Sequence, residues 1–162
     1  MCIRDSGSCS GPVLGTGTSA LFATTGITAI VPEDTATALH AAATDAAGNV
    51  SVCSAAFTYT EDSTGPGAPS ITGTDPAVQP SDDPTPRVIG TAEADSIVTI
   101  YAGPDCSSPL ETGGAAAFAA GIVLTAPLPV GITNLHALAI DAAGNDSLCS
   151  GPFPYEVVLP PP

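Results

Sequence analysis

Cysteine is the residue type in this 162-residue sequence whose spacing most clearly indicates chemistry. Apart from Cys2, the cysteines form two pairs of matched spacing, Cys9 with Cys53 and Cys106 with Cys149. An even set at matched spacings is typical of a disulfide framework, so we predict one disulfide in each half of the chain. Closing a loop of about 45 residues stabilises a domain by roughly 4 kcal/mol and implies an oxidising compartment.

Two alternatives involve the same cysteines. The first is a pair of free buried thiols, because Cys106 should follow the third strand of its domain, whose end could lie far from the last strand. The second is zinc, which needs closely spaced ligand pairs. His40 and His136 are each a single ligand separated from the next cysteine by a long gap. We therefore predict no zinc site and expect both histidines to cover the outer surface of a sheet.

Catalysis by serine is the next possibility that the residue types raise. The chain is rich in serine, but it holds no G-x-S-x-G motif, and Cys9 occupies the centre of the similar GSCSG. A nucleophilic serine is typically presented on such a strand-to-helix turn. We predict no catalytic residue, no cofactor-binding residue and no enzyme activity.

Calcium is the serious alternative for bound chemistry. Hard cations prefer carboxylate oxygens, and Glu61, Asp62 and Asp75 lie near an expected junction between domains. Further acidic residues are Asp82, Asp83, Asp95 and Asp105. No D-x-D-x-D-G loop is present, and acidic loops more often keep an exported protein soluble. Calcium therefore stays open as an alternative.

A repeated turn motif, D-A-A-G-N, is expected to have a structural role. Gly and Asn tolerate positive φ, and the preceding Asp can accept hydrogen bonds from backbone N–H groups of the turn. The residues that we predict to cap these two turns are Asp45, Gly48, Asn49, Asp141, Gly144 and Asn145.

The turn belongs to a longer internal repeat. Residues 39–54 (LHAAATDAAGNVSVCS) recur 96 residues later as residues 135–150 (LHALAIDAAGNDSLCS). At the same offset of 96 residues, Phe22 matches Phe118. Phe57 likewise matches Phe153, and Tyr59 matches Tyr155. A period of this length suits a whole small domain in tandem.

The repeat sets the expected domain boundaries. We predict a partial module at residues 7–60 that lacks its opening strands, a linker at 61–69 (EDSTGPGAP) and a nearly complete module at 70–157. Residues 158–162 read as the start of another linker. Residues 1–6 (MCIRDS) resemble neither a signal peptide nor the repeat, and we exclude them from the fold as a non-native, adapter-like leader.

Composition limits the fold class and the partners. Seventeen Gly and seventeen Pro interrupt the chain too often for a long helix, and aromatic residues make up 4%. Many short strands around a thin core are expected. The net charge is −14, with Arg4 and Arg87 as the only basic residues, so nucleic acid is not an expected partner. No apolar stretch is long enough for membrane insertion of this fragment.

The second module reads as six or seven strands. Alternation places Leu135, Ala137 and Ala139 on one face, which should meet an opposing sheet, and residues 39, 41 and 43 repeat that pattern. The expected strands are residues 70–73, 87–92, 97–102, 122–126, 134–141 and 148–157.

A family resemblance rests on these motifs. A-x-D-A-A-G-N-x-S, preceded by I-T-G-T-D-P and R-V-I-G-T-A-E-A-D-S-x-V-T-I-Y, resembles bacterial immunoglobulin-like (Ig-like) repeat domains of large surface and secreted proteins. The resemblance implies an all-β fold of tandem Ig-like β-sandwiches, the first truncated at its N-terminus. Asn49 and Asn145 also begin N-x-S sequons, but in a bacterial family their coincidence with the turn is the better explanation.

The resemblance implies an extracellular or cell-surface location and three functions. The first is a non-catalytic structural spacer whose partners are neighbouring Ig-like modules of the same chain. The second is an adhesion module for a protein or glycan ligand, rigidified by calcium in one version. The third is an accessory module of an exported hydrolase. Fold alone does not choose among them.

Overall fold

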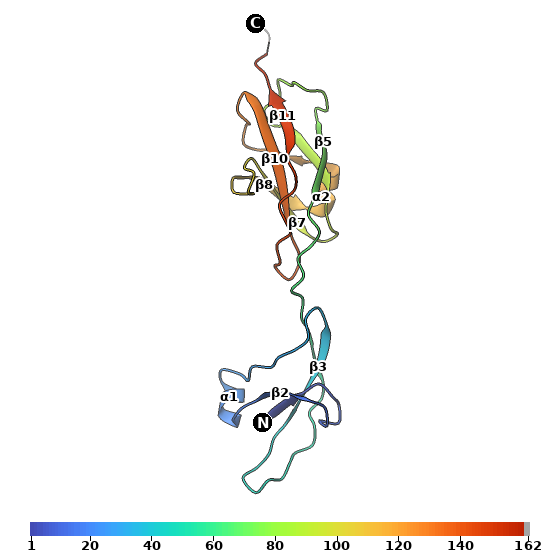
Figure 1. The fold of residues 1–162 in the computed structure, drawn as a ribbon, viewed down its shortest axis with the longest axis vertical. Coiled ribbons are helices and arrows are strands. Elements are labelled where there is room, and N and C mark those ends of the chain that lie inside the picture. The colour runs from blue at the N-terminus through green and yellow to red at the C-terminus, as the bar shows by residue number, and fades with distance from the viewer. Residues whose placement is uncertain (161–162) are drawn as a thin grey trace. The chain divides into compact units, whose positions relative to one another are not determined.

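The computed structural model describes residues 1–160 and divides the chain into two compact units, Met1–Ser63 (unit 1) and Thr64–Pro162 (unit 2). The described residues form antiparallel strands in three sheets and two short helices, which confirms the all-β prediction (Figure 1). Among those residues, no helix has the length and apolar character needed to cross a membrane.

Unit 2 consists of two antiparallel sheets. One has the strand order β5-β6-β9 and the other β11-β10-β7-β8. In Figure 1, β10 and β11 run side by side, as their pairing requires. The elements are β5 (Ser70–Asp75), β6 (Arg87–Thr91), β7 (Ile97–Tyr101), β8 (Pro109–Gly114), α2 (Ala115–Ala120), β9 (Ile122–Val123), β10 (Gly131–Ile140) and β11 (Phe153–Val157).

The core of unit 2 receives side chains from both sheets. Alternation along β10 buries Leu135, Ala137 and Ala139, which confirms the predicted inward face. They pack in one cluster with residues of β6 and β7, including Val88 and Ile100. Alanine at two of these positions lets the sheets approach closely, so a core with few aromatic side chains can still be dense.

The predicted elements of unit 2 differ from the observed ones in several respects. β8 was not predicted, because its sequence PLETGG begins with proline and ends with two glycines. The helix α2 was not predicted either; its alanine run is anchored by the buried Phe118. The strand expected over residues 148–157 begins only at Phe153, and the one expected over 122–126 ends at Val123.

Unit 1 repeats one of these two sheets. Its strand order β2-β1-β3-β4 matches β8-β7-β10-β11. The register also matches, because Ile3 lies opposite Ala41 as Ile100 lies opposite Ala137. The elements are β1 (Cys2–Arg4), β2 (Val13–Thr16), α1 (Ser19–Ala23), β3 (Ala36–Ala42) and β4 (Phe57–Thr60).

Part of the segment 1–6, which the sequence analysis leaves out of the fold, forms a strand in this structure. Cys2–Arg4 form a strand between β2 and β3, at the position that β7 has in unit 2. The edges of β2 and β3 leave unpaired backbone groups that any short extended segment can satisfy.

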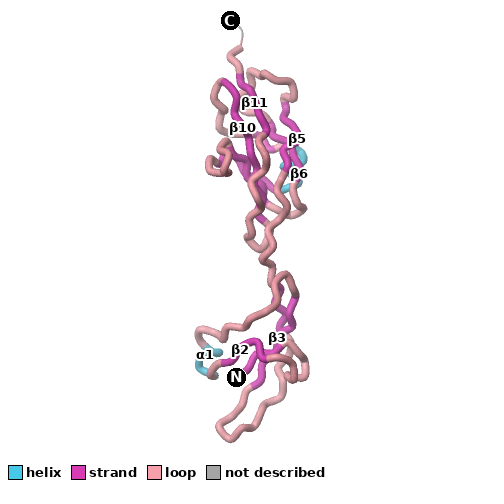
Figure 2. Tube along the Cα trace, viewed as in Figure 1, coloured by secondary structure: helices cyan, strands magenta, loops and turns pink. Residues whose placement is uncertain are grey.

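The prediction that Leu39, Ala41 and Ala43 meet an opposing sheet was also wrong. Ala43 is exposed, and Leu39 and Ala41 are only partly buried. The reason is that residues 1–63 hold no counterpart of β5 and β6, so this face of the sheet has no partner sheet. Figure 2 shows how much of this unit is loop rather than strand.

The residues predicted as a linker divide between the two units. In unit 1, the backbone N–H of Asp34 donates to the Glu61 carboxylate at 2.6 Å, and Ser63 N–H donates to the Asp34 carboxylate at 3.0 Å. In unit 2, Pro66 is buried and Gly67 N–H donates to the Glu93 carboxylate at 3.2 Å. The acidic side chains thus fix the two ends of this segment locally.

Candidate functional site

The disulfides are the repeated chemical feature of the chain. Cys9 pairs with Cys53 and Cys106 with Cys149, with Cα–Cα distances of 5.7 and 5.9 Å, as predicted. Cys9 and Cys106 also share an unusual backbone, with φ of 50° and 49°. Cys2 is a free cysteine of intermediate exposure.

The geometric objection to the second disulfide fails because Cys149 does not lie in the last strand. After β10 the chain turns and runs back along that strand as the return segment, residues 146–152. Its backbone N–H groups at Ser147 and Ser150 donate to the carbonyls of Ala139 and Ala137, both at 2.8 Å. Cys149 thereby lies near the part of β10 in which His136 pairs with Tyr101, the last residue of β7.

The disulfide consequently crosses over β10. This strand pairs with β7 on one edge and contacts the return segment on the other. Cys106 lies in the loop that follows β7, so its bond to Cys149 joins the two flanking segments. Three neighbouring stretches of the sheet are held by one covalent link.

Four serines that the sequence analysis overlooked complete this arrangement. In unit 2, the backbone N–H of Ala139 donates to Ser147 Oγ at 2.9 Å, and that of Ala137 donates to Ser150 Oγ at 2.8 Å. Ser51 and Ser54 accept the equivalent bonds in unit 1. The hydroxyls replace the backbone carbonyls that a regular strand would supply. The signal was available, since both serines recur three residues apart in the two copies.

Replacing Ser150 with alanine is expected to lower the free energy of unfolding of unit 2 by about 1–3 kcal/mol, because the buried N–H of Ala137 loses its acceptor. Urea unfolding followed by NMR peak intensities measures the change. Thr125→Ala on the exposed surface is the control. A Ser150→Ala variant as stable as this control would contradict the acceptor role.

The D-A-A-G-N turns are held by their aspartates. Asp141 Oδ1 accepts hydrogen bonds from three backbone N–H groups at 2.8–2.9 Å, those of Ala143, Gly144 and Asn145, and Oδ2 accepts from the Asn145 side-chain amide at 3.0 Å. Gly144 takes the positive φ, at 96°.

The same turn in unit 1 has the same construction. Asp45 accepts from the backbone N–H groups of Ala47 and Asn49 and from the Asn49 amide, at 2.8–2.9 Å. Gly48 has φ of 88°. In both turns Gly supplies the left-handed backbone, and Asn contributes its side chain.

These hydrogen bonds favour the ionised carboxylates. The Asn49 side chain, followed by backbone N–H groups, lowers the pKa of Asp45, and the backbone N–H of Asn145, followed by its amide, lowers the pKa of Asp141. Because each pKa is lower in the folded state, the turn contributes its full stability above the unfolded value of about 3.9. That contribution is lost as the pH falls from there through the lower folded pKa.

The histidines act as structural donors within the sheet. His136 Nδ1 lies 2.9 Å from the Ser150 carbonyl oxygen, and His40 Nδ1 lies 3.0 Å from that of Ser54. A carbonyl oxygen only accepts, so Nδ1 carries the proton in both. Both rings are buried. The predicted position on the outer side of the sheet is therefore covered by the return segment rather than open.

The acidic residues considered for calcium are distributed over both units. Glu61 and Asp62 belong to unit 1, where the Glu61 carboxylate binds the Asp34 N–H, and Asp75 ends β5 in unit 2. Within residues 1–160, no group of three or more His, Cys, Asp or Glu side chains is arranged to hold a metal ion. Asp83 instead accepts from Thr85 N–H at 2.8 Å.

The sequons coincide with residues that already have structural partners. Asn145 donates to Asp141, and Ser147 is buried against β10. Comparison with known proteins adds no assignment: no protein-family model matches the chain, and no curated protein is significantly similar to it.

Proposed function

We propose that this chain is a non-catalytic structural spacer from a secreted or cell-surface protein built of tandem Ig-like modules. The observation that carries the proposal is that one covalently stapled sheet occurs twice, with the same strand order and the same turn, return segment and disulfide. The repeated features are those that hold the fold together, so the repeat favours a structural role over a catalytic one.

The topology of unit 2 supports the Ig-like assignment. Seven strands form two antiparallel sheets, and the chain changes sheets between β6 and β7, between β8 and β9, and between β9 and β10. Such crossings between packed sheets are typical of Ig-like sandwiches. The buried cluster that includes Val88, Ile100 and Leu135 forms the core between them.

The expected environment also supports a role outside the cell. Disulfides persist where the surroundings are not reducing, and the chain forms one in each unit. A net charge of −14 keeps such a surface soluble and disfavours nonspecific adhesion to polyanions. Both properties suit an exported spacer.

Stretching the full chain between two handles tests the proposal. The loop locked between Cys106 and Cys149 spans 43 residues, so the unfolded length of unit 2 should grow by about 15 nm after reduction. In parallel, the oxidised chain is applied to arrays of glycans and extracellular proteins. Cooperative unfolding under load without saturable binding supports a spacer. Saturable binding that loop substitutions abolish would replace it with the adhesion function.

A further inference from the structure

A short stretch of β10 has an unpaired edge within the sheet of unit 2. The carbonyl of Ala137 accepts from the return segment, so the odd-numbered positions of β10 direct their backbone groups to that edge and the even-numbered positions to the β7 edge. β7 pairs only with residues 136–140. In the described part of the chain, the backbone N–H and C=O groups of Ile132 and Asn134 therefore have no hydrogen-bond partner.

The loop after β7 turns away from this edge instead of continuing along it. The Cys106 N–H donates to the Gly103 carbonyl oxygen at 3.1 Å and closes the turn. The disulfide then joins Cys106 to Cys149, which lies in the return segment on the opposite edge of β10. Pro104 in the same loop has no N–H with which to extend the pairing. The disulfide loop thus leaves the edge of β10 uncovered.

A hollow of about 420 Å³ lies along the uncovered edge. Its wall includes Ile132 and Asn134 from β10 and Pro104 and Pro129 from the adjoining loops. Its volume falls within the range of about 300–1,000 Å³ that is typical of ligand sites. Proline cannot continue a β-ladder, so the two prolines limit any added strand to a few residues. We call this hollow, with the edge of residues 132–134, the notch.

His136 adds a buried acceptor to the notch. Its Nδ1 donates to the Ser150 carbonyl oxygen at 2.9 Å, so Nε2 carries the lone pair, and Nε2 has no partner among the described residues. The side chain is 5% exposed and borders the hollow. In unit 1, a Cβ added at Gly7, the counterpart of Pro104, would lie 3.8 Å from Cε1 and 3.9 Å from Nε2 of His40. This edge of the ring therefore faces the wall that Pro104 forms.

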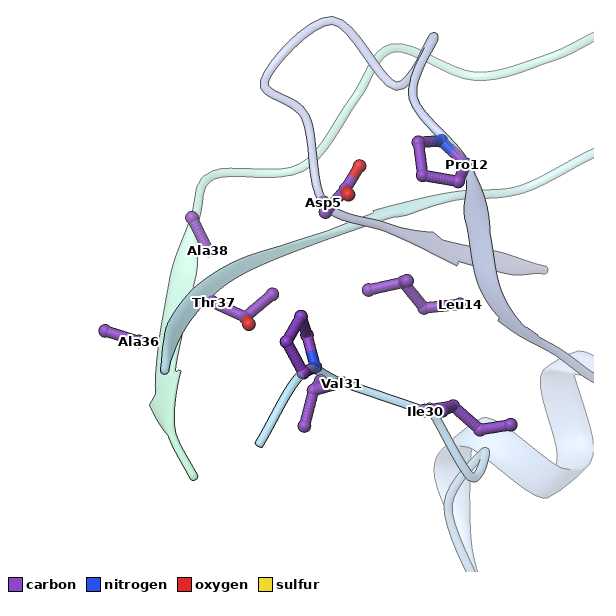
Figure 3. A pocket seen from close by; sticks show the side chains of 9 residues that line it. Asp5, Pro12, Leu14, Ile30, Val31, Ala36, Thr37 and Ala38 are labelled. Carbon is purple, nitrogen blue, oxygen red and sulfur yellow. The ribbon is translucent and has the colours of Figure 1, made fainter. Parts of the chain in front are cut away.

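Unit 1 repeats the construction of the notch. β1 pairs with β3 only at residues 40–42, so Ala36 and Ala38 extend past its end. Figure 3 shows both alanines beside a hollow, with Asp5 at its wall. The loop after β1 is held by the equivalent disulfide. The uncovered edge therefore accompanies the repeated disulfide loop and is not an irregularity of one unit.

The groups in the notch define the chemistry of an occupant. Ile132 and Asn134 each offer one N–H and one C=O, about 7 Å apart along the strand. An extended peptide presents matching acceptors and donors at the same spacing, whereas an isolated ammonium or guanidinium group has no acceptor. The net charge is −14, Asp105 follows Pro104, and no Lys or Arg borders the hollow. These charges favour a basic peptide.

We propose that the notch binds an extended, basic peptide segment of another chain, which adds a short strand beside residues 132–134. The peptide exchanges backbone hydrogen bonds with Ile132 and Asn134, and one of its donors reaches Nε2 of His136. The site goes beyond the spacer function and does not rest on it. Because its main contacts are with the backbone of β10, side-chain substitutions in the loops would not abolish the binding, and its failure would leave the spacer function untouched.

The probe is the peptide KTVTK with blocked ends, added to the oxidised, ¹⁵N-labelled full chain. Saturable NMR shifts are expected at Ile132, Asn134 and His136, together with slower hydrogen exchange at the first two. Two further peptides carry N-methyl groups, one on the valine and one on both threonines. Alternate N–H groups of a strand face the same neighbour, so one methylated peptide should bind at least tenfold more weakly than the other. ETVTE should also bind at least tenfold more weakly than KTVTK.

Two variants at one position complete the test. Asn134→Pro removes the N–H that faces the notch without removing a bond to β11, and it should weaken KTVTK binding at least tenfold. Asn134→Ala keeps this N–H and should bind as the unchanged chain does. If the proline variant fails to fold, the methylated peptides decide the question alone.

Several outcomes would overturn the proposal. They are equal binding of the two methylated peptides, equal binding of ETVTE and KTVTK, equal binding by the folded proline and alanine variants, and no saturation at millimolar peptide. Lysine amide that binds as tightly as KTVTK would show that the notch holds only a cationic group. Shifts at the notch that depend on protein concentration without peptide would show that a second copy is the occupant. Both of these results would also overturn the proposal.

Discussion

Replacing Phe118 with alanine should lower the free energy of unfolding of unit 2 by about 3–5 kcal/mol, the range for deleting a fully buried phenylalanine. The ring fills the space between α2 and Gly90 of β6, so its removal leaves a cavity that the backbone of β6 cannot fill. Such a loss is large compared with the total stability of a small domain.

The repeat provides a matched control for this substitution. Phe22→Ala changes the same residue type at the equivalent helix of unit 1, where the ring is half exposed, and should cost less than about 1 kcal/mol. Urea titration followed by unit-specific NMR intensities resolves the two transitions. Similar costs for the two substitutions would mean that Phe22 is already buried in solution.

Removing the second disulfide should have an effect of the same size. The double variant Cys106→Ser, Cys149→Ser should lose about 4 kcal/mol, because its unfolded chain regains the freedom of a loop closed over 43 residues. The return segment also loses its covalent attachment to the loop after β7, so hydrogen exchange should rise first at Ala137 and Ala139.

The measurement is urea unfolding of the oxidised protein and of the double variant under non-reducing conditions. Cys2→Ser, which removes only the free thiol, is the control and also prevents disulfide exchange. An unchanged unfolding midpoint in the double variant would show that hydrogen bonds from Ser147 and Ser150 alone secure the return segment.

Sequence reasoning located the features that depend on local patterns. Alternation identified the inward face of β10, the paired spacing identified both disulfides, and Asp, Gly and Asn identified the turns. Each of these follows from residue types a few positions apart or from the repeat. Such signals survive without knowledge of the tertiary arrangement.

Features that depend on distant partners were missed. The PLETGG sequence of β8 has weak strand preference and pairs because β7 offers an edge. Ser147 and Ser150 look like ordinary loop residues until the chain is seen to run back along β10. The inward face of β3 has the right alternation, but burial also requires a second sheet, which residues 1–63 do not supply.

The strand β1 is specified by very few residues. Three residues, Cys2–Arg4, restore the four-strand order of the sheet and share with β7 the isoleucine that faces the central alanine. The information that specifies this strand therefore resides mainly in the edges of its two neighbours.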